Sequence, residues 1–396
     1  MNSSSRLNQA PGPSTGISYD IESEVLQRYQ EGARQQQPNL CCPTEYASTY
    51  LELIPQEIID KDYGCGDPTQ YVNAGETVID LGAGAGKNCY IVAQKLGSEG
   101  QAIGVDFNDE MLTLARKYQD EFSNRLGYRN TSFLKGKIQD LALPLDLVQA
   151  WLQEHPISSL DDLMAYEQEC NRLRQSAPLI ADASVDVVIS NCVLNLVRPD
   201  DKRQLFQEIH RVLKPGGRAV ISDIVCDEPP TQAILSDPGL WSGCIAGAFL
   251  EAGFLAMFED AGFYGVEILN REETPWQTID GIEFRSMTVR AYKGNNGDRR
   301  DRKQAVLYRG PWKQVTDDDG RTYTRGEKIA VCDRTYQAMT SPNSPYEAHV
   351  IGLEPRVPVP PEEAKEFSCC SPSIRSPREL KGATYRQTQS NPPRCC

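Results

Sequence analysis

The sequence contains few histidines and no long apolar segment. Only three of its 396 residues are histidine, and none stands beside a cysteine as a Cys/His zinc pattern would require. No apolar run reaches the roughly 20 residues needed to cross a bilayer. Residues 1–16 are rich in Ser, Pro and Asn and lack the apolar core of a signal peptide. We therefore expect a cytoplasmic protein with no membrane association.

Basic residues are also outnumbered. The chain has 41 Lys and Arg against 55 Asp and Glu, which gives a formal net charge of −14. Such a surface repels phosphate backbones, so we expect no nucleic-acid partner. The most basic stretch, residues 298–303, has acids interleaved with its cations and reads as a solvated linker. No coiled-coil or repeat pattern is present, and a monomer is expected.

Cysteine, in contrast, is abundant. An odd total of 13 cysteines without a signal peptide argues against a framework of structural disulfides. Three pairs are adjacent in sequence, Cys41-Cys42, Cys369-Cys370 and Cys395-Cys396, and no pair of CxxC motifs indicates a zinc site. Reactive or ligand-binding thiols are the better interpretation in a reducing compartment.

Short apolar runs divide the chain into segments. Strands are expected at 77–81, 102–106, 131–136, 185–190 and 218–223, and helical patterns alternate with them. This alternation predicts an α/β fold with a Rossmann-like, doubly wound parallel sheet. A smaller α+β C-terminal module would carry strands near 306–308, 322–324 and 329–332.

These patterns give a predicted domain organisation. It comprises a disordered N-terminus at 1–16, a helical segment at 17–75 that carries Cys41, Cys42 and Cys65, a Rossmann-like domain at 76–230 with a helical insertion at 144–176, a region at 231–292 that carries Cys244, a small module at 299–358 and a flexible Cys-containing tail at 359–396. The role of the insertion does not follow from its sequence.

A glycine-rich turn is the main sign of a nucleotide-like ligand. Gly82, Gly84 and Gly86 lie between a predicted strand and a helix, where the missing side chains let the backbone approach a ligand. Asp106 ends the next strand and could accept hydrogen bonds from both ribose hydroxyls. The spacing fits a dinucleotide as well as S-adenosylmethionine. Asp80 favours S-adenosylmethionine, because a carboxylate suits its cationic amino group and sits poorly beside a pyrophosphate.

Other residues are expected around the same ligand. Ile138 and Gln139 follow the third strand, where the adenine edge would lie, and Asn191 ends the fourth strand beside the reacting methyl group. Met111 could pack on the adenine face, although core packing explains it equally well. A tight turn without any ligand remains the alternative for the glycine motif.

Three cysteines fall beside this expected pocket. Cys65 lies in Tyr-Gly-Cys-Gly at 63–66, Cys192 in Ser-Asn-Cys-Val-Leu-Asn-Leu at 190–196, and Cys244 in Trp-Ser-Gly-Cys-Ile-Ala-Gly-Ala at 241–248. Three thiols suggest a trivalent, thiophilic methyl acceptor. Each of them could instead be a small buried core residue.

These motifs resemble the arsenite S-adenosylmethionine methyltransferases from about residue 25 to residue 289. The resemblance implies a class I methyltransferase fold, S-adenosylmethionine as donor and a substrate region at 231–292. It implies that Cys192 and Cys244 bind As(III), with Cys65 as a further candidate. Cys65 would also exchange disulfides with Cys41 or Cys42. The insertion at 144–176 and the cysteine pairs of the tail depart from the family pattern.

The expected activity is therefore methylation of trivalent arsenic for detoxification. The arsenic lone pair is itself a nucleophile, which agrees with the absence of an obvious His or carboxylate dyad from the sequence. Thioredoxin or glutathione would restore the thiols. Two alternatives stay open: a methyltransferase for another metalloid or a small thiol, and a thiol-rich metalloid-binding protein without catalysis.

Overall fold

The computed structural model describes residues 19–37, 46–294, 297, 299–342, 344–368 and 374–382. The chain forms two compact units, residues 1–293 and 294–396. Cys41, Cys42, residues 1–16 and the cysteine pairs of the tail lie outside the described residues, so the expectations about them stay predictions.

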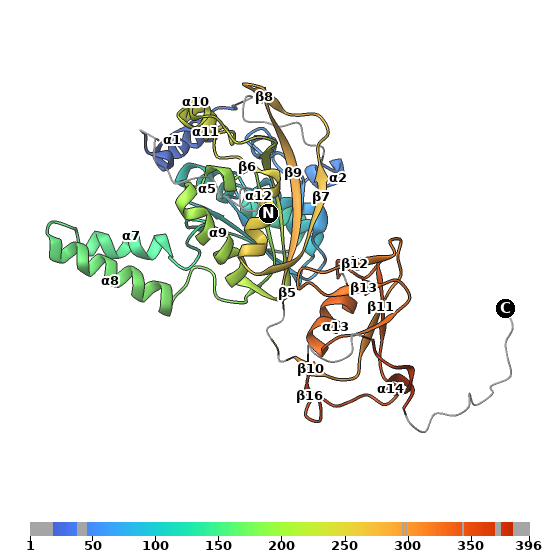
Figure 1. The fold of residues 1–396 in the computed structure, drawn as a ribbon. Helices are drawn as coiled ribbons and strands as arrows, with labels where there is room; N and C mark the ends of the chain where they lie inside the picture. Colours follow the sequence, from blue (N-terminus) through green and yellow to red (C-terminus); the bar gives the residue numbers. More distant parts are fainter. Residues whose placement is uncertain are drawn as a thin grey trace. The chain divides into compact units, whose positions relative to one another are not determined.

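The first unit is built on one mixed sheet (Figure 1) in the order β3-β2-β1-β4-β5-β9-β7, with β6 on β5 and β8 on β9. The strands are β1 Thr77–Leu81, β2 Gln101–Asp106, β3 Thr131–Lys135, β4 Val185–Asn191, β5 Leu213–Cys226, β6 Phe249–Leu250, β7 Phe263–Arg271, β8 Gln277–Ile279 and β9 Ile282–Lys293. Strands β1 to β5 pair in parallel, whereas β9 runs antiparallel to β5 and β7. All five predicted strands and the α/β class are confirmed.

The sheet contradicts the expected boundary at residue 230. Strand β9 pairs with β5 from Arg218 to Cys226, so the chain after residue 230 completes the sheet of the preceding domain. Without β9, strand β5 would be the edge of the sheet and would expose unpaired backbone groups, so the pairing with β9 satisfies them. Residues 231–292 therefore belong to the same compact unit.

Helices cover both faces of the sheet. They are α1 Ile21–Arg34, α2 Ser48–Leu51, α3 Gln56–Ile59, η2 Pro68–Tyr71, α4 Lys87–Leu96, α5 Asp109–Lys117, α6 Gln119–Leu126, α7 Leu145–Glu154, α8 Leu160–Ser176, η3 Leu194–Leu196, α9 Pro199–Val212, α10 Gln232–Leu235, α11 Pro238–Ser242 and α12 Glu251–Asp260. Among the described helices, none has the length and apolar character that spanning a bilayer would require.

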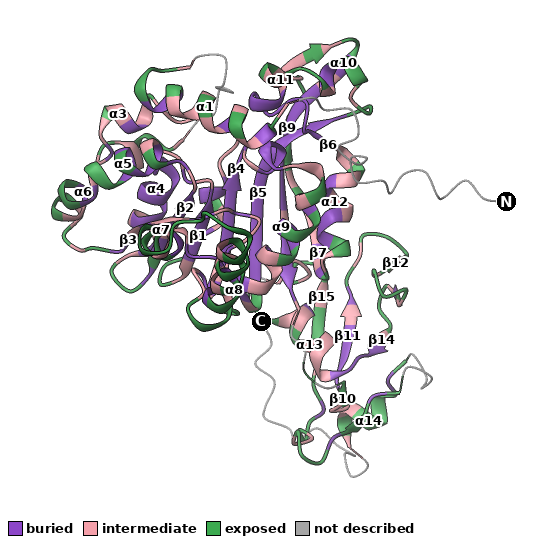
Figure 2. Ribbon diagram, turned by 90° about the vertical axis from the view of Figure 1, so that its left-hand side faces the viewer, coloured by how far each residue is buried: buried purple, intermediate pink, exposed green. Residues whose placement is uncertain are grey.

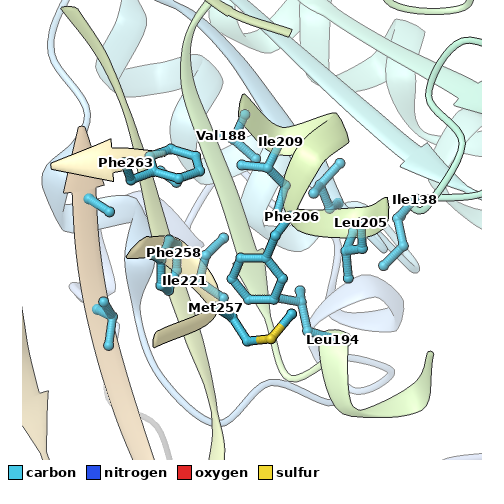
Figure 3. Close-up of a cluster of buried hydrophobic side chains, with 14 of the residues drawn as sticks. Ile138, Val188, Leu194, Leu205, Phe206, Ile209, Ile221, Met257, Phe258 and Phe263 are labelled. Carbon is cyan, nitrogen blue, oxygen red and sulfur yellow. The ribbon is translucent and has the colours of Figure 1, made fainter. Parts of the chain in front are cut away.

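Alternate residues of each strand supply two cores, one on each face. On β1, Ile79 belongs to the cluster with α9 and α12, while Val78 belongs to the cluster with α4 and α5. In the first cluster Phe206 meets Phe258 edge to face at a centroid distance of 4.9 Å (Figure 3). Figure 2 shows the resulting pattern, with buried central strands and exposed outer faces on α7 and α8.

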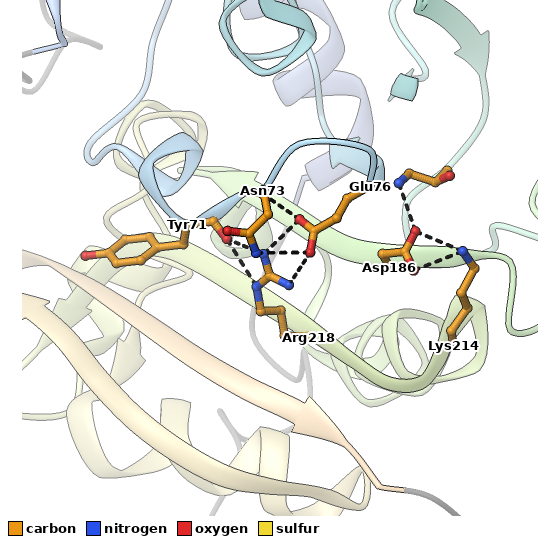
Figure 4. A network of polar contacts seen from close by, with 7 residues as sticks. Tyr71, Asn73, Glu76, Asp186, Lys214 and Arg218 are labelled. Atoms are coloured by element: carbon orange, nitrogen blue, oxygen red, sulfur yellow. Dashed lines mark hydrogen bonds and ion pairs between the residues drawn. The ribbon is translucent and has the colours of Figure 1, made fainter. Parts of the chain in front are cut away.

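A polar network anchors the segment that enters β1 (Figure 4). Arg218 binds both carboxylate oxygens of Glu76 at 2.7 and 2.9 Å and donates to the Tyr71 carbonyl at 2.5 Å. Asp186 accepts from Lys214 at 2.8 Å and from the Thr77 amide at 2.9 Å. These bonds join β1, β4 and β5 at their amino-terminal side, which leaves the opposite edge free for the site.

The insertion at 144–176 is helical, as predicted. Helices α7 and α8 form a hairpin (Figure 1) with a small apolar cluster of its own, formed by Leu143, Val148, Cys170 and Leu173. Arg174 ties the hairpin to Asp140 at 2.9 Å.

The described part of the second unit holds small sheets and two helices. Its elements are β10 Arg300–Asp301, β11 Ala305–Tyr308, β12 Gln314–Thr316, β13 Thr322–Thr324, β14 Lys328–Ala330, α13 Asp333–Thr340, β15 Val350–Leu353, β16 Lys365–Glu366 and α14 Pro377–Lys381. The prediction of a flexible tail from residue 359 is wrong for its described part. Strand β16 pairs with β10, and the buried Arg375 forms an ion pair with Asp301 at 2.7 Å.

Candidate functional site

A cavity opens at the carboxyl ends of β1, β2 and β4, where the strand order reverses. This is the position at which open α/β sheets bind ligands. Of the predicted cofactor residues, the cavity is lined by Gly82, Gly84, Asp106, Met111, Ile138, Gln139 and Asn191, and Cys192 joins them. Its lining among the described residues includes neither Asp80 and Gly86 nor Cys65 and Cys244.

The glycine turn explains why the backbone forms the cavity wall. Gly82, Gly84 and Gly86 have φ angles of +69°, +51° and +89°, a region that side chains disfavour. A β-carbon placed on Gly84 would meet nothing within 4 Å, whereas one on Gly82 would come within 2.4 Å of Val193. Gly84 therefore leaves room for a ligand, and Gly82 lets the turn pack against the residue that follows Cys192.

Asp106 is held ready to accept hydrogen bonds. Its oxygens accept from the amides of Gly84 at 2.8 Å and Asn108 at 2.9 Å. A carboxylate retains lone pairs beyond these two bonds, and two hydroxyls of a ribose would suit them. Burial raises the pKa of Asp106 above its usual value. The Met111 and Ile138 side chains add apolar surface to the same wall, so the residues present fit a nucleoside.

Asp80 is a buried carboxyl next to the turn. Burial raises its pKa to about 8, and the nearby charges of Asp62 and Asp106 add to this increase. The thiol of Cys89 donates to it at 3.5 Å. A cationic ligand group would stabilise the ionised carboxyl groups of this cluster. The acidic surroundings therefore fit the sulfonium and amino charges of S-adenosylmethionine better than they fit a pyrophosphate.

The three predicted cysteines meet beside this cavity. The sulfurs of Cys65 and Cys192 and a carboxylate oxygen of Asp223 all lie within 4.8 Å of one another. The thiol of Cys244 donates to the carbonyl of Cys192 at 3.0 Å. All four residues are buried. Three separate segments of the chain thus converge on one thiol cluster, made of Cys65, Cys192 and Cys244.

Two of these cysteines have strained backbones. Cys192 and Cys244 adopt φ angles of +64° and +62°, which cost residues with side chains about 1–3 kcal/mol each. Two hydrogen bonds hold the Cys192 turn. The Cys192 amide donates to the Ser222 carbonyl at 2.8 Å, and the Leu194 amide donates to the Asp223 carboxylate at 2.8 Å. Strain that the surrounding structure enforces in this way is typical of functional sites.

Asn191 clamps the loop that carries Cys65. Its side-chain oxygen accepts from the amides of Cys65 at 2.8 Å and Gly66 at 3.0 Å. Its nitrogen donates to the Gly66 carbonyl at 2.7 Å and the Tyr46 hydroxyl at 3.0 Å. These four bonds use the full capacity of an amide. Asn191 lines the cavity as predicted, yet its polar atoms position Cys65.

Two thiols of the cluster, those of Cys65 and Cys192, favour the protonated form when nothing is bound. Burial raises the pKa of Cys65. Hydrogen bonds with Cys244 and Cys65, together with burial, raise the pKa of Cys192 well above its usual value. A thiophilic atom that replaces the protons reverses this preference, because it neutralises the thiolates that burial disfavours.

Tyr29 is a site residue that the sequence analysis missed. It lies on α1, lines the cavity and hydrogen-bonds with Cys244. Burial, followed by the charges of Cys244 and Cys192, raises its pKa well above the usual value. On the same helix, the Glu22 carboxylate accepts hydrogen bonds from the Lys137 amine at 2.7 Å and from the Gln139 side-chain amide at 3.2 Å, across the cavity. The helical spacing of Val25 and Tyr29 was visible in the sequence, but nothing there indicated which surface the helix covers.

Known proteins resemble the chain at two levels. Two family models described as a methyltransferase domain match residues 72–176 and 175–221, and a domain of unknown function matches residues 295–385. The arsenite methyltransferase of Aquipseudomonas alcaligenes is 30% identical over 318 residues, which cover 76% of this chain and 81% of that protein. The arsenite methyltransferase of Mus musculus is 28% identical over 303 residues, covering 73% and 70% respectively.

One solved structure extends the likeness to three dimensions. CrArsM, an arsenic (III) S-adenosylmethionine methyltransferase from Chlamydomonas reinhardtii, aligns with a TM-score of 0.53 and 27% identity. The alignment covers 80% of this chain and 99% of that chain.

Proposed function

The chain belongs to the arsenite methyltransferase family, and from this premise we propose that it methylates trivalent arsenic held by Cys65, Cys192 and Cys244. Its fold is that of the class I methyltransferases, as predicted, and S-adenosylmethionine is the methyl donor. The main support is one observation: Cys192 belongs both to the thiol cluster and to the wall of the cavity that carries the glycine turn and Asp106. An atom bound there would lie next to the donor.

The cavity residues would hold the donor in one orientation. Asp106 accepts the ribose hydroxyls, Met111 and Ile138 pack on the adenine, and Gln139 lies near its edge. Asp80 and Asp62 supply negative charge for the cationic end. When bound, S-adenosylmethionine supplies an electrophilic methyl group. The residues named here orient that group and exclude water from it.

The thiols would present the substrate as a nucleophile. As(III) is soft and bonds three thiolates in a pyramid, which leaves a lone pair at the apex. That lone pair forms the new bond to carbon, so no general base is required. The rigid cluster contributes mainly by position, because holding two reactants in line replaces a bimolecular encounter.

Returning the methylated arsenic to the trivalent state requires two electrons. Arsenic becomes formally pentavalent when its lone pair bonds to carbon, and a pair of thiols that closes to a disulfide can return it to the trivalent state. We propose Cys65 with Cys41 or Cys42 as that pair. Thioredoxin or glutathione would then reduce the disulfide, and the methylated product would serve detoxification.

A turnover assay tests the proposal. Purified protein is incubated with S-adenosylmethionine, As(III) and a thiol reductant, and the arsenic species are separated and counted by mass spectrometry. We expect methylated arsenic from the unaltered protein and from Cys170→Ser, a matched change of a buried thiol in the α7–α8 hairpin. Cys192→Ser and Cys244→Ser should abolish the product.

Two other results would point elsewhere. Tight As(III) binding without a methylated product would contradict the proposal and leave a thiol-rich binding protein. Turnover that survives both substitutions would indicate an acceptor that needs no thiol cluster.

A further inference from the structure

A carboxylate stands among the thiols, and the methyl transfer proposed above does not use it. Asp223 lies on β5 and has no exposed surface. One of its oxygens is within 4.8 Å of the sulfurs of both Cys65 and Cys192. Amides of Leu194 and Ile224 each donate to it at 2.8 Å, which fixes its orientation.

Arsenic and divalent d10 cations need different ligand sets. Trivalent arsenic is satisfied by three sulfurs, because its lone pair occupies the fourth direction, and a hard carboxylate adds little to a soft centre. Zn²⁺, and Cd²⁺ by the same d10 chemistry, takes four ligands in a tetrahedron and accepts carboxylate oxygen together with thiolate. A cluster of three sulfurs and one carboxylate therefore meets the requirement of the divalent cation.

The spacing allows such a tetrahedron after a small contraction. With Zn–S bonds of about 2.3 Å, two sulfurs of a tetrahedral site lie about 3.8 Å apart. The atoms of Cys65, Cys192 and Asp223 already lie within 4.8 Å of one another. Cys244, whose thiol donates to the Cys192 carbonyl at 3.0 Å, lies beside this group and would supply the fourth ligand.

A buried cation balances part of the charge. Lys202 is 1% exposed, and its amine donates to the Gly247 carbonyl at 2.5 Å. Its charge interacts favourably with Asp223 and Cys244. Three thiolates and a carboxylate exceed the charge of one dication, and Lys202 offsets part of that excess.

We propose that Cys65, Cys192, Cys244 and Asp223 form a tetrahedral site for a thiophilic divalent cation such as Zn²⁺ or Cd²⁺. Binding releases the three thiol protons to solvent and changes no oxidation state. Since the same sulfurs would hold arsenic, the cation and As(III) exclude each other. Sequence spacing does not indicate this site, because its four ligands come from four separate segments.

The test measures binding alone and needs no methyl donor. The full-length chain is prepared with the vicinal pairs Cys41-Cys42, Cys369-Cys370 and Cys395-Cys396 changed to serine, so that those thiols do not compete. The reduced, metal-free protein is titrated with Cd²⁺ and followed by thiolate-to-metal charge-transfer absorption. In parallel it is titrated with As(III).

Asp223→Asn separates the two ligands. We expect it to weaken Cd²⁺ binding at least about tenfold, which is the loss that even an outer-shell partner of a metal site can cause. As(III) affinity should stay within about twofold, because its three sulfurs remain. Cys226→Ser, which removes a buried thiol outside the cluster, should change neither affinity. Unchanged Cd²⁺ affinity in Asp223→Asn would overturn the proposal.

Competition between the two ligands provides a second readout in case Asp223→Asn fails to fold. If Asp223→Asn loses As(III) binding as well, competition decides the question in the protein that retains Asp223. We expect As(III) to displace bound Cd²⁺ one for one. Simultaneous binding of both would refute the shared site. A protein that binds both ligands competitively but yields no methylated arsenic would contradict only the proposed function.

Discussion

Replacing Gly247 by alanine would place a methyl group against the backbone that follows Cys192. A β-carbon at this position would lie 2.0 Å from the carbonyl oxygen of Asn195 and 3.3 Å from the Trp241 ring. The obstacle is backbone, so a rotamer change cannot relieve the clash. The two segments that carry Cys192 and Cys244 would have to move apart.

Several bonds resist that movement. Asn195 donates to the Cys244 carbonyl at 3.1 Å, Lys202 donates to the Gly247 carbonyl at 2.5 Å, and the Cys244 thiol donates to the Cys192 carbonyl at 3.0 Å. Overpacking costs about 1–3 kcal/mol, and each lost hydrogen bond adds about 1 kcal/mol. We expect Gly247→Ala to lower the free energy of unfolding by about 2–4 kcal/mol.

The same shift should separate the thiols. A loss of alignment worth about 1.4 kcal/mol weakens binding tenfold, so As(III) affinity should fall at least about tenfold. Affinity for S-adenosylmethionine should change little, because neither Gly247 nor Cys244 lines the cavity among the described residues. Urea unfolding followed by circular dichroism and calorimetric titration with each ligand measure the three quantities.

Gly253→Ala is the matched control. Its β-carbon would make an ordinary contact of 3.6 Å with Leu250, and helix α12 should gain about 0.5–1 kcal/mol from losing a glycine. Normal stability and normal As(III) affinity in Gly247→Ala would refute the reasoning that this contact sets the spacing of the two cysteines.

Three further outcomes are expected. Asp80 has a pKa of about 8 in the fold against about 3.9 in an unfolded chain, so its ionisation destabilises the native state as the pH rises between those values. In urea unfolding without ligand, the free energy of unfolding of Asp80→Asn should equal that of the wild type at pH 3 and exceed it at pH 9. Asn191→Ala leaves the Cys65 amide without its hydrogen-bond acceptor, so mass spectrometry should detect faster alkylation of the Cys65 thiol. An unchanged alkylation rate would argue that Asn191 does not hold the loop of Cys65 in place. Arg375→Ala leaves the partly buried Asp301 with Lys303 as its remaining ion-pair partner, and hydrogen exchange at residues 300–308 should report a loss of about 2 kcal/mol with no change in methyl-donor binding.

The nucleotide side of the site was predictable because its signals are local. A strand, a glycine turn and a helix follow one another within residues 77–96, and Asp106 ends the next strand at the expected spacing. Parallel strands bring their carboxyl ends to one edge of the sheet, so sequence order alone indicates that these groups meet. The cavity lining agrees with seven of the nine residues expected there.

The thiol cluster was only partly predictable. The contexts of Cys65, Cys192 and Cys244 indicated a thiophilic site, but their mutual approach depends on how three loops pack. Tyr29 and Asp223 were not predicted as site residues, because an amphipathic helix and a buried strand offer ordinary explanations for them. Their places in the site follow from contacts with residues far away in the chain.

The sequence by itself therefore determined the α/β class and the glycine turn, and it singled out the contexts of three cysteines, since periodicity and short motifs encode these within one or two elements. The tertiary structure alone decided that β9 completes the sheet, that Asn191 positions Cys65, and that Asp223 stands among the sulfurs. Such contacts join residues from separate elements, and only the packed sheet brings those residues within bonding distance.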